Sequence, residues 1–303
     1  MKRDLVSISD LEPDQLNAIF SLAQRLKRER RAGQTHPLLS GKTLAMLFEK
    51  PSLRTRVTFE AGMVQLGGYA VYLSPADIGL GTRESPTDVA RNLSRWVDLI
   101  MVRTFAHQTV LELAEQATVP VINGLSDLSH PCQILADCLT LIEQRGRLDG
   151  LRIAFVGDGN NVVNSWLNAA AKLPISFRLA CPPGYEPDAA LLAAAQTAGG
   201  DIRVSHALQD AVDGADVVYT DVWTSMGQED ESVVRQQTFT PYQVNAEVLA
   251  LAKPEALVMH CLPAHRGQEI SAEVLDGPQS VVLEQAENRL HVQKAVMVWL
   301  LLD

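Results

Sequence analysis

Short apolar runs and stretches with helical apolar spacing alternate along most of the chain. In the first half, the runs predict buried strands, and the segments between them place apolar residues on one helical face. These strands are expected at residues 43–48, 69–73, 99–102 and 119–123. Strands that alternate with helices are typical of parallel sheets, because each crossover helix returns the chain to the same end of the sheet.

The same pattern starts again after residues 146–150, which contain two glycines. Further strands are predicted at 152–156, 177–180, 217–219 and 257–259. A chain of 303 residues, 47% of them hydrophobic, can bury two such cores. We therefore predict an α/β fold of two tandem doubly wound parallel-sheet domains, at residues 1–147 and 148–287. The final helix, 288–303, is apolar all round, and we expect it to return to the first domain and pack across both.

Three local features refine this prediction. Ser9 and Glu12 have the spacing of a capping box, so a helix is expected to begin there and run toward Arg31. The polar residues 77–84 are predicted as a loop. Residues 227–240 are also predicted as a loop, either a lid over a cleft or a solvated surface segment.

Composition excludes several classes of protein. With 36 acidic and 26 basic residues, the net charge is −10, which argues against a broad nucleic-acid footprint, so any anion site must be local. The longest apolar run, residues 295–302, is far too short for a membrane span, and the first residues lack an apolar signal core. The four cysteines have no paired spacing, which indicates reduced thiols and a cytoplasmic protein.

Candidate chemistry gathers in the loops that follow predicted strands, where parallel sheets bind their ligands. Ser52 is a good N-cap for a helix after the strand at 43–48, and Arg54 and Arg56 follow it. Unpaired amides, the helix dipole and guanidinium groups suit a phosphate dianion, although an N-cap with solvated arginines is the alternative.

Two further loops contain residues that could contact a small ligand. Arg103 stands just past a strand end, and His130 and Gln133 lie three apart at a helix start. Taken separately, the first is explained as a surface arginine and the second as a helix cap with a chance histidine.

Together, these loops closely resemble the carbamoyl phosphate half of the carbamoyltransferase family. The motifs are Phe-Glu-Lys-Pro-Ser-x-Arg-Thr-Arg, Met-x-Arg-x-Phe-x-His and His-Pro-x-Gln, in that order. The resemblance implies that Arg103 bridges phosphate and carbonyl oxygen, that His130 polarises the carbonyl, and that Gln133 holds the carbamoyl amide. The residues that would hold the phosphate are Ser52, Leu53 through its amide, Arg54 and Thr55. Gly79 departs from the many relatives that carry Gln or His there to reach carbamoyl phosphate.

The second half resembles the ornithine branch of the family, through Asp-Gly-Asn-Asn, Asp-x-Trp-x-Ser-Met-Gly and His-Cys-Leu-Pro. The resemblance implies that ornithine is bound by Asn161, Asp221, Ser225 and Met226. It also implies that Cys261 lies by the reacting amine and contacts the carbamoyl group, as do the Leu262 carbonyl and Arg289.

The implied activity is transfer of the carbamoyl group of carbamoyl phosphate to the side-chain amine of L-ornithine, giving L-citrulline and phosphate. Biosynthesis is the default direction because the equilibrium favours citrulline. The catalytic residues would be Arg103, His130, Asp221 and Cys261. No metal or other cofactor is expected. Relatives are homotrimers with sites at subunit interfaces, and residues 77–84 would lean into a neighbour's site.

Four alternatives compete with this assignment. A nicotinamide dehydrogenase is disfavoured because Val162 occupies the third glycine position of the dinucleotide fingerprint, and Ala180 and Cys181 stand where a ribose-binding acid belongs. Aspartate as acceptor would need basic residues where Asp221 stands. Putrescine or acetylated ornithine is less easily excluded. A non-catalytic binding subunit would have lost several site residues, and Gly79 is the only site position that departs from the family pattern.

Overall fold

The computed structural model describes every residue except Met1, Met226, Gln228 and Asp303, and the chain forms two compact units. Unit 1 comprises Met1–Leu139 and Glu287–Asp303, and unit 2 comprises Thr140–Ala286. The division falls inside helix α6 (Pro131–Arg145), earlier than the predicted boundary after residue 147. Gly146, with φ of 74°, ends that helix, so the glycines mark the helix end and not the division between cores.

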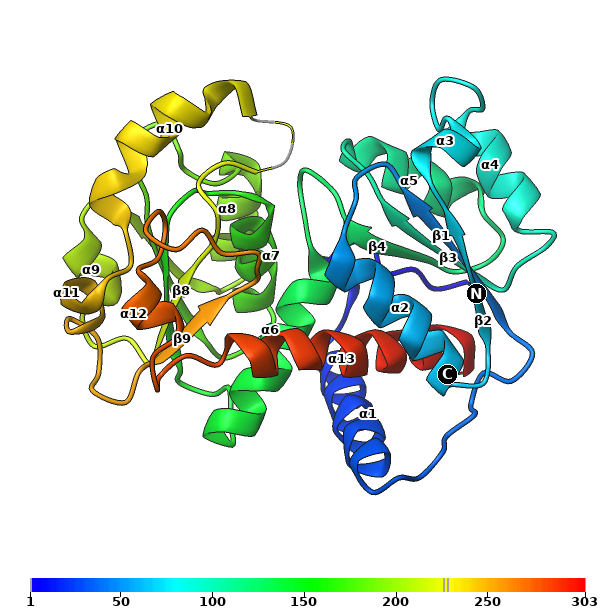
Figure 1. The fold of residues 1–303 in the computed structure, drawn as a ribbon, viewed down its shortest axis with the longest axis horizontal. Coiled ribbons are helices and arrows are strands. Elements are labelled where there is room, and N and C mark those ends of the chain that lie inside the picture. Colours follow the sequence, from blue (N-terminus) through cyan, green and yellow to red (C-terminus); the bar gives the residue numbers. More distant parts are fainter. Residues whose placement is uncertain (1, 226, 228, 303) are drawn as a thin grey trace. The chain divides into compact units, whose positions relative to one another are not determined.

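Unit 1 is built on a parallel sheet with strand order β2-β1-β3-β4 (Figure 1). Its strands are β1 (Thr43–Phe48), β2 (Tyr69–Leu73), β3 (Leu99–Arg103) and β4 (Val121–Leu125). Its helices include α1 (Pro13–Arg31), α2 (Leu53–Gln65), α3 (Pro75–Ile78), α4 (Pro86–Leu93) and α5 (His107–Gln116). The chain leaves β1 toward one edge and returns to build the other, so the strand order reverses between β1 and β3.

Unit 2 has a parallel sheet with strand order β7-β6-β5-β8-β9, and its order reverses between β5 and β8. Its strands are β5 (Arg152–Val156), β6 (Ser176–Ala180), β7 (Asp201–Ser205), β8 (Val217–Thr220) and β9 (Leu257–His260). Its helices include α7 (Asn161–Ala170), α8 (Ala189–Thr197), α9 (Leu208–Val212), α10 (Ser232–Phe239), α11 (Ala246–Leu249) and α12 (Ala272–Leu275). Points of reversal are where open α/β sheets bind ligands, because neighbouring loops diverge there.

These sheets confirm the predicted fold class of two parallel α/β units, followed by the C-terminal helix α13 (Val282–Leu302). Edge strand β7 was not predicted, since in it only Ile202 is buried and the strand lacks an apolar run. Across the described residues, no helix combines the length and apolarity needed to cross a bilayer.

Two local predictions were wrong. Ser9 lies inside a short 3-10 helix, Ile8–Asp10, and α1 begins later, with Glu12 as N-cap in a capping box with Gln15. Pro13 explains the shift, because proline suits the first helical turn, where its missing N–H costs nothing.

The stretch 227–240 is not a loop throughout, because α10 (Ser232–Phe239) occupies its second half. Arg235 and Phe239 are buried at a spacing of four, whereas Val233 and Val234 are exposed. The two exposed valines obscure the helical pattern in the sequence, so polarity alone suggested a loop.

Helix α13 crosses α2 in unit 1 (Figure 1), and the two helices pack together at Gly62. Gly62 allows the close approach, since a Cβ there would lie 3.2 Å from the Lys294 side chain. Lys294 is fully buried; its ammonium group lies 2.9 Å from His36 Nε2 and donates to Gln65 at 3.1 Å. Glu29 lies 3.2 Å from His36 Nδ1. A neutral His36 can therefore accept from the ammonium group through Nε2 and help to hold α13 in place.

Burial lowers the pKa of Lys294 from 10.5 to about 8; Arg30 lowers it further and Glu29 opposes the shift. The unfolded chain therefore binds more protons than the folded one between these pH values, and stability should rise with pH across that interval. We expect the free energy of unfolding of the wild type, relative to Lys294→Met, to increase from pH 8 to pH 10. The slope for one proton is at most ~1.4 kcal/mol per pH unit.

The measurement is denaturant unfolding of both proteins at matched pH values. Gln34→Met is the control, because that exposed side chain carries no ionisable group and its difference from wild type should stay flat. A wild-type minus Lys294→Met difference that does not change with pH would contradict the prediction.

Candidate functional site

The first group of candidate residues lies where the strand order of unit 1 reverses. Ser52 is the N-cap of α2, directly after β1, and its hydroxyl accepts from the Thr55 amide at 3.2 Å. Arg103 ends β3, the strand next to β1, and is 6% exposed. The sequence predicted both positions, and the parallel register brings them to one edge of the sheet.

Two guanidinium groups share the Thr55 hydroxyl. Arg103 Nη1 lies 3.4 Å from Thr55 Oγ1, and Arg289 Nη2, from helix α13, lies 3.2 Å from the same oxygen. Arg289 Nη1 also donates to Gln133 Oε1 at 2.5 Å. Residues from α2, β3, α6 and α13 are thus drawn into one cluster, although they are up to 234 positions apart in the chain.

His130 belongs to the same cluster and is buried beside it. Burial holds its pKa well below the usual 6.5, and the charges of Arg289, Arg103 and Arg54 lower it further. The imidazole is therefore neutral at pH 7 and can donate one hydrogen bond without adding to the positive charge. The sequence assigned His130 and these three arginines to one ligand, and the structure places them close enough to interact electrostatically.

Leu53 and Arg56 differ from their neighbours. The Leu53 side chain is 75% exposed, which suits a residue that contributes only its amide. Arg56 stacks on Tyr72 with its guanidinium carbon 3.7 Å from the ring centroid, and it pairs with Glu60. These contacts make Arg56 a structural residue on the outer side of α2.

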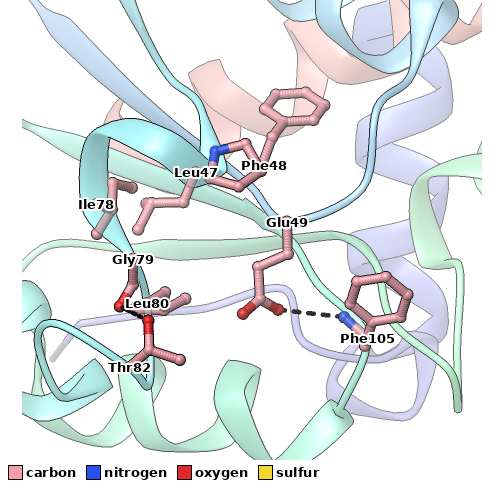
Figure 2. Close-up of a pocket in the computed structure, with 9 residues that line it drawn as sticks. Leu47, Phe48, Glu49, Ile78, Gly79, Leu80, Thr82 and Phe105 are labelled. Atoms are coloured by element: carbon pink, nitrogen blue, oxygen red, sulfur yellow. Dashed lines mark hydrogen bonds between the residues drawn. The ribbon is translucent and has the colours of Figure 1, made fainter.

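A cavity of about 240 Å³ borders the same sheet edge, between the end of β1 and the segment around Gly79 (Figure 2). Glu49 extends along it and accepts from the Phe105 amide at 3.3 Å. Gly79 has φ of 57°, and a Cβ there would lie 2.8 Å from the Cβ of Arg83. The left-handed backbone explains why this position is a glycine.

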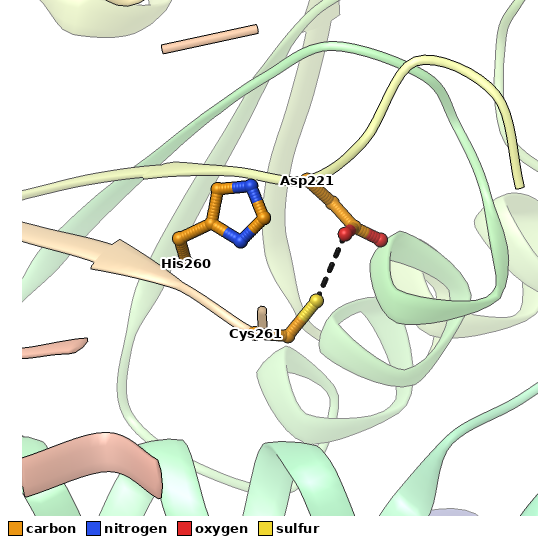
Figure 3. Close-up of side chains that lie close together, drawn as sticks. All are labelled: Asp221, His260 and Cys261. Carbon is orange, nitrogen blue, oxygen red and sulfur yellow. Dashed lines mark hydrogen bonds between the residues drawn. The ribbon is translucent and has the colours of Figure 1, made fainter. Parts of the chain in front are cut away.

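The second group lies where the order of unit 2 reverses. Asp221 follows β8, and its carboxylate accepts from Cys261 Sγ at 2.9 Å (Figure 3). The same carboxylate accepts from Asn160 Nδ2 at 3.0 Å. Asn160 also caps α7, because its Oδ1 accepts from the amides of Val162 and Val163. Three strand-end loops therefore meet at Asp221, which is 7% exposed.

His260 and Glu269 form a buried pair next to this group, and neither was predicted from the sequence as a site residue. His260 Nε2 lies 3.0 Å from Glu269 Oε1, and both side chains are fully buried. Burial alone would raise the pKa of Glu269, but hydrogen bonds from His260 and the His265 amide outweigh it and lower that pKa. His260 Nδ1 accepts from the Leu262 amide at 2.8 Å. Leu262 has φ of 59°, a strained conformation that this bond helps to hold.

Asp221, His260 and Cys261 each present a possible metal-ligand atom, all within 4.8 Å of one another. The two His260 nitrogens are already engaged, one with Glu269 and the other with the Leu262 amide. A metal ion would have to break one of these bonds, so the group fits a metal site poorly.

The remaining predicted residues of the second half are placed less directly. Asn161 is the first residue of α7, half-buried beside Asn160. Ser225 is half-buried in the loop after β8. Met226 lies outside the described residues. Asn160, which was not predicted, makes the contact to Asp221, and its position between a strand and a helix was the available signal.

Two family models match the chain in tandem. Residues 3–143 match the carbamoyl-P binding domain of aspartate/ornithine carbamoyltransferase, and residues 149–300 match the Asp/Orn binding domain. The ornithine carbamoyltransferase of Syntrophus aciditrophicus is 54% identical over 298 residues, covering 98% of this chain and 99% of its own.

Solved structures agree with this similarity. The ornithine carbamoyltransferase of Pyrococcus furiosus has a TM-score of 0.96 at 49% identity, covering 99% of this chain and 97% of its own. The enzyme of the same name from Thermus thermophilus has a TM-score of 0.90 at 49% identity, covering 99% of both chains.

Proposed function

We propose that this chain, which belongs to the aspartate/ornithine carbamoyltransferase family, transfers the carbamoyl group of carbamoyl phosphate to L-ornithine. The observation that carries the proposal is the convergence of Arg54, Arg103 and Arg289 on a buried, neutral His130. Such a cluster, in a protein of net charge −10, calls for a small anion that also offers a polarisable oxygen. The products are L-citrulline and phosphate, and biosynthesis is the direction that the equilibrium favours.

We assign carbamoyl phosphate to unit 1. The amides at the start of α2, the Ser52 hydroxyl and Arg54 suit the phosphate, because an N-terminal helical turn attracts anions. Thr55 positions Arg103 and Arg289 through its hydroxyl. Arg103 and His130 then stabilise the negative charge that develops on the carbonyl oxygen, and donors of this kind are worth about 3 kcal/mol each.

We assign ornithine to unit 2, with Asp221 as the partner of its side-chain amine. The amine resembles that of lysine, with a pKa of about 10.4 in water, so it must lose a proton before it attacks. Asp221 and Cys261 form a hydrogen-bonded pair that can accept or relay that proton. Asn161, Ser225 and Met226 are assigned to the amino acid end of ornithine by their family motifs.

His260 and Glu269 act through the backbone of the following residues. By holding the Leu262 amide, His260 fixes the direction of the Leu262 carbonyl and the position of Cys261. The carbonyl can then accept a hydrogen bond from the carbamoyl nitrogen. The reaction proceeds by direct attack of the amine and needs no cofactor.

A cytoplasmic homotrimer is the form we propose for the working enzyme. Apolar side chains on α2 and edge strand β2 support an interface, since Val57, Val64 and Tyr69 are 49%, 67% and 66% exposed. The free thiols, three of them buried, suit a reducing compartment.

The acceptor assignment is tested by incubating the protein with carbamoyl phosphate and, in separate reactions, ornithine, aspartate, putrescine or acetylated ornithine. We expect citrulline from ornithine and little product from aspartate, because Asp221 attracts an ammonium group and repels a second carboxylate. Putrescine and acetylated ornithine should also give little product, because they lack the free α-amino acid end assigned to Asn161, Ser225 and Met226. Product from another amine, with none from ornithine, would overturn the assignment.

The roles in unit 1 are tested by a matched pair of arginine variants. Arg103→Gln should lower kcat about 10²–10³-fold, because it removes a charge from the developing oxyanion. Arg56→Gln, which removes an arginine of α2 that stacks on Tyr72 outside the cluster, should keep kcat within about threefold. Equal losses in the two variants would contradict the assignment.

The trimer is tested by the mass in solution, measured by light scattering. We expect three times the mass of one chain, and a smaller species for Val64→Glu, because a charge on that exposed apolar surface would oppose association. A monomer at working concentration would rule the trimer out.

A further inference from the structure

A buried carboxylate lies directly behind Gln133, and the proposed function leaves it without a role. Asp137 is on α6, one helical turn after Gln133, and is fully buried. Gln133 Nε2 donates to Asp137 Oδ1 at 2.8 Å, the i, i+4 pairing that suits Gln and Asp on a helix. Gln133 itself is 1% exposed.

The neighbours of Gln133 determine which way its amide points. On one side Arg289, which has only donors, lies 2.5 Å from it. On the other side the Asp137 side chain lies 2.8 Å from it, and Asp137 Oδ1 accepts from Gln133 Nε2. Only one orientation satisfies both, with Oε1 toward Arg289 and Nε2 toward Asp137. A flipped amide would place two donors together at one end and two acceptors at the other.

That orientation has a chemical consequence for the acyl group. Gln133 Oε1 has two lone pairs, of which Arg289 takes one. The second can accept a hydrogen bond from an NH₂ group, but it gains nothing from a methyl group. Carbamoyl phosphate and acetyl phosphate differ in this respect alone, since NH₂ in one replaces CH₃ in the other.

We infer that Asp137 is a positioning residue for the acyl donor: it fixes the Gln133 amide so that its oxygen selects carbamoyl phosphate over acetyl phosphate. The inference rests on the proposed function and deepens it. In both reactions the amine nitrogen of ornithine bonds to the acyl carbon, and the bond from that carbon to the phosphate oxygen breaks. Phosphate leaves with the electron pair, and the amine loses one proton to solvent.

The experiment measures kcat/KM with ornithine for each acyl donor, by mass spectrometry of citrulline and of side-chain acetylated ornithine. Their ratio is the selectivity. Asp137→Leu leaves Gln133 Nε2 without its acceptor and frees the amide to rotate, so the selectivity should fall about tenfold or more. Asp137→Asn can still accept through its side-chain oxygen, and it should stay within about threefold of wild type. Asp137→Ser, one atom too short to reach Gln133, is a second variant with the same expectation as Asp137→Leu.

Two controls separate selectivity from a general loss of stability. Asp98→Leu removes a carboxylate of unit 1 that accepts from Lys42 and the Thr43 amide outside the cluster. It should lower the unfolding temperature without changing the selectivity. Gln133→Leu should lose selectivity by itself, and adding Asp137→Leu to it should lower selectivity no further, because the carboxylate acts through the amide.

The outcomes distinguish failure of the proposed function from failure of the inference about Asp137. If the wild type forms neither product, the proposed function and the inference both fail. If the wild type forms citrulline but folded Asp137→Leu and Asp137→Ser keep its selectivity, only the inference fails. Losses that simply multiply in the Gln133→Leu, Asp137→Leu double variant would also overturn it, since they would show that Asp137 acts by another route.

Discussion

Positive charge held inside unit 1 is the constraint on which the proposed chemistry depends. Arg103 is 6% exposed and Arg289 only 2%, and both donate to the Thr55 hydroxyl. Like charges so placed cost free energy unless something negative offsets them, and the same charges keep His130 neutral. These buried charges form a preorganised anion site, which is a common property of catalytic sites.

Supporting contacts around this cluster fix its geometry. Asp137 holds one end of Gln133, and Arg289 holds the other. Helix α13, which carries Arg289, is itself held through Lys294 and His36. Each of these residues is buried, so a displacement of one side chain displaces the side chain that it contacts. The polar interior of unit 1 thus serves orientation more than stability.

In unit 2 the corresponding constraint is the backbone. Leu262 adopts a left-handed conformation, and the His260–Glu269 pair is buried beneath it to hold its amide. Asp221 collects Asn160 and Cys261 from two other strand-end loops. A strained turn and a shared carboxylate thereby bring together side chains that are separated by as many as 101 positions, from 160 to 261.

Much of this was predictable, for local reasons. Strands such as β1, β3 and β5 are buried apolar runs, and their loops carry motifs long enough to be recognised. Predictions failed where the local sequence pattern was weak or was compatible with more than one structure. The edge strand β7 buries too little to form an apolar run, two exposed valines obscured α10, and Pro13 displaced the start of α1. His260, Glu269 and Asp137 were missed because a buried polar residue looks the same in sequence as an exposed one.

The sequence by itself determined most of the elements, the parallel character of the sheets and the chemical types available at the strand ends, because periodicity and motif spacing are local properties. Tertiary structure decided which of those groups act on one another. Only the packing of α13 against α2 places Arg289 beside Gln133, and only burial makes His130 neutral. Hydrogen-bond partners and pKa values depend on the distances and solvent exposure of groups far apart in the chain, and no local pattern encodes them.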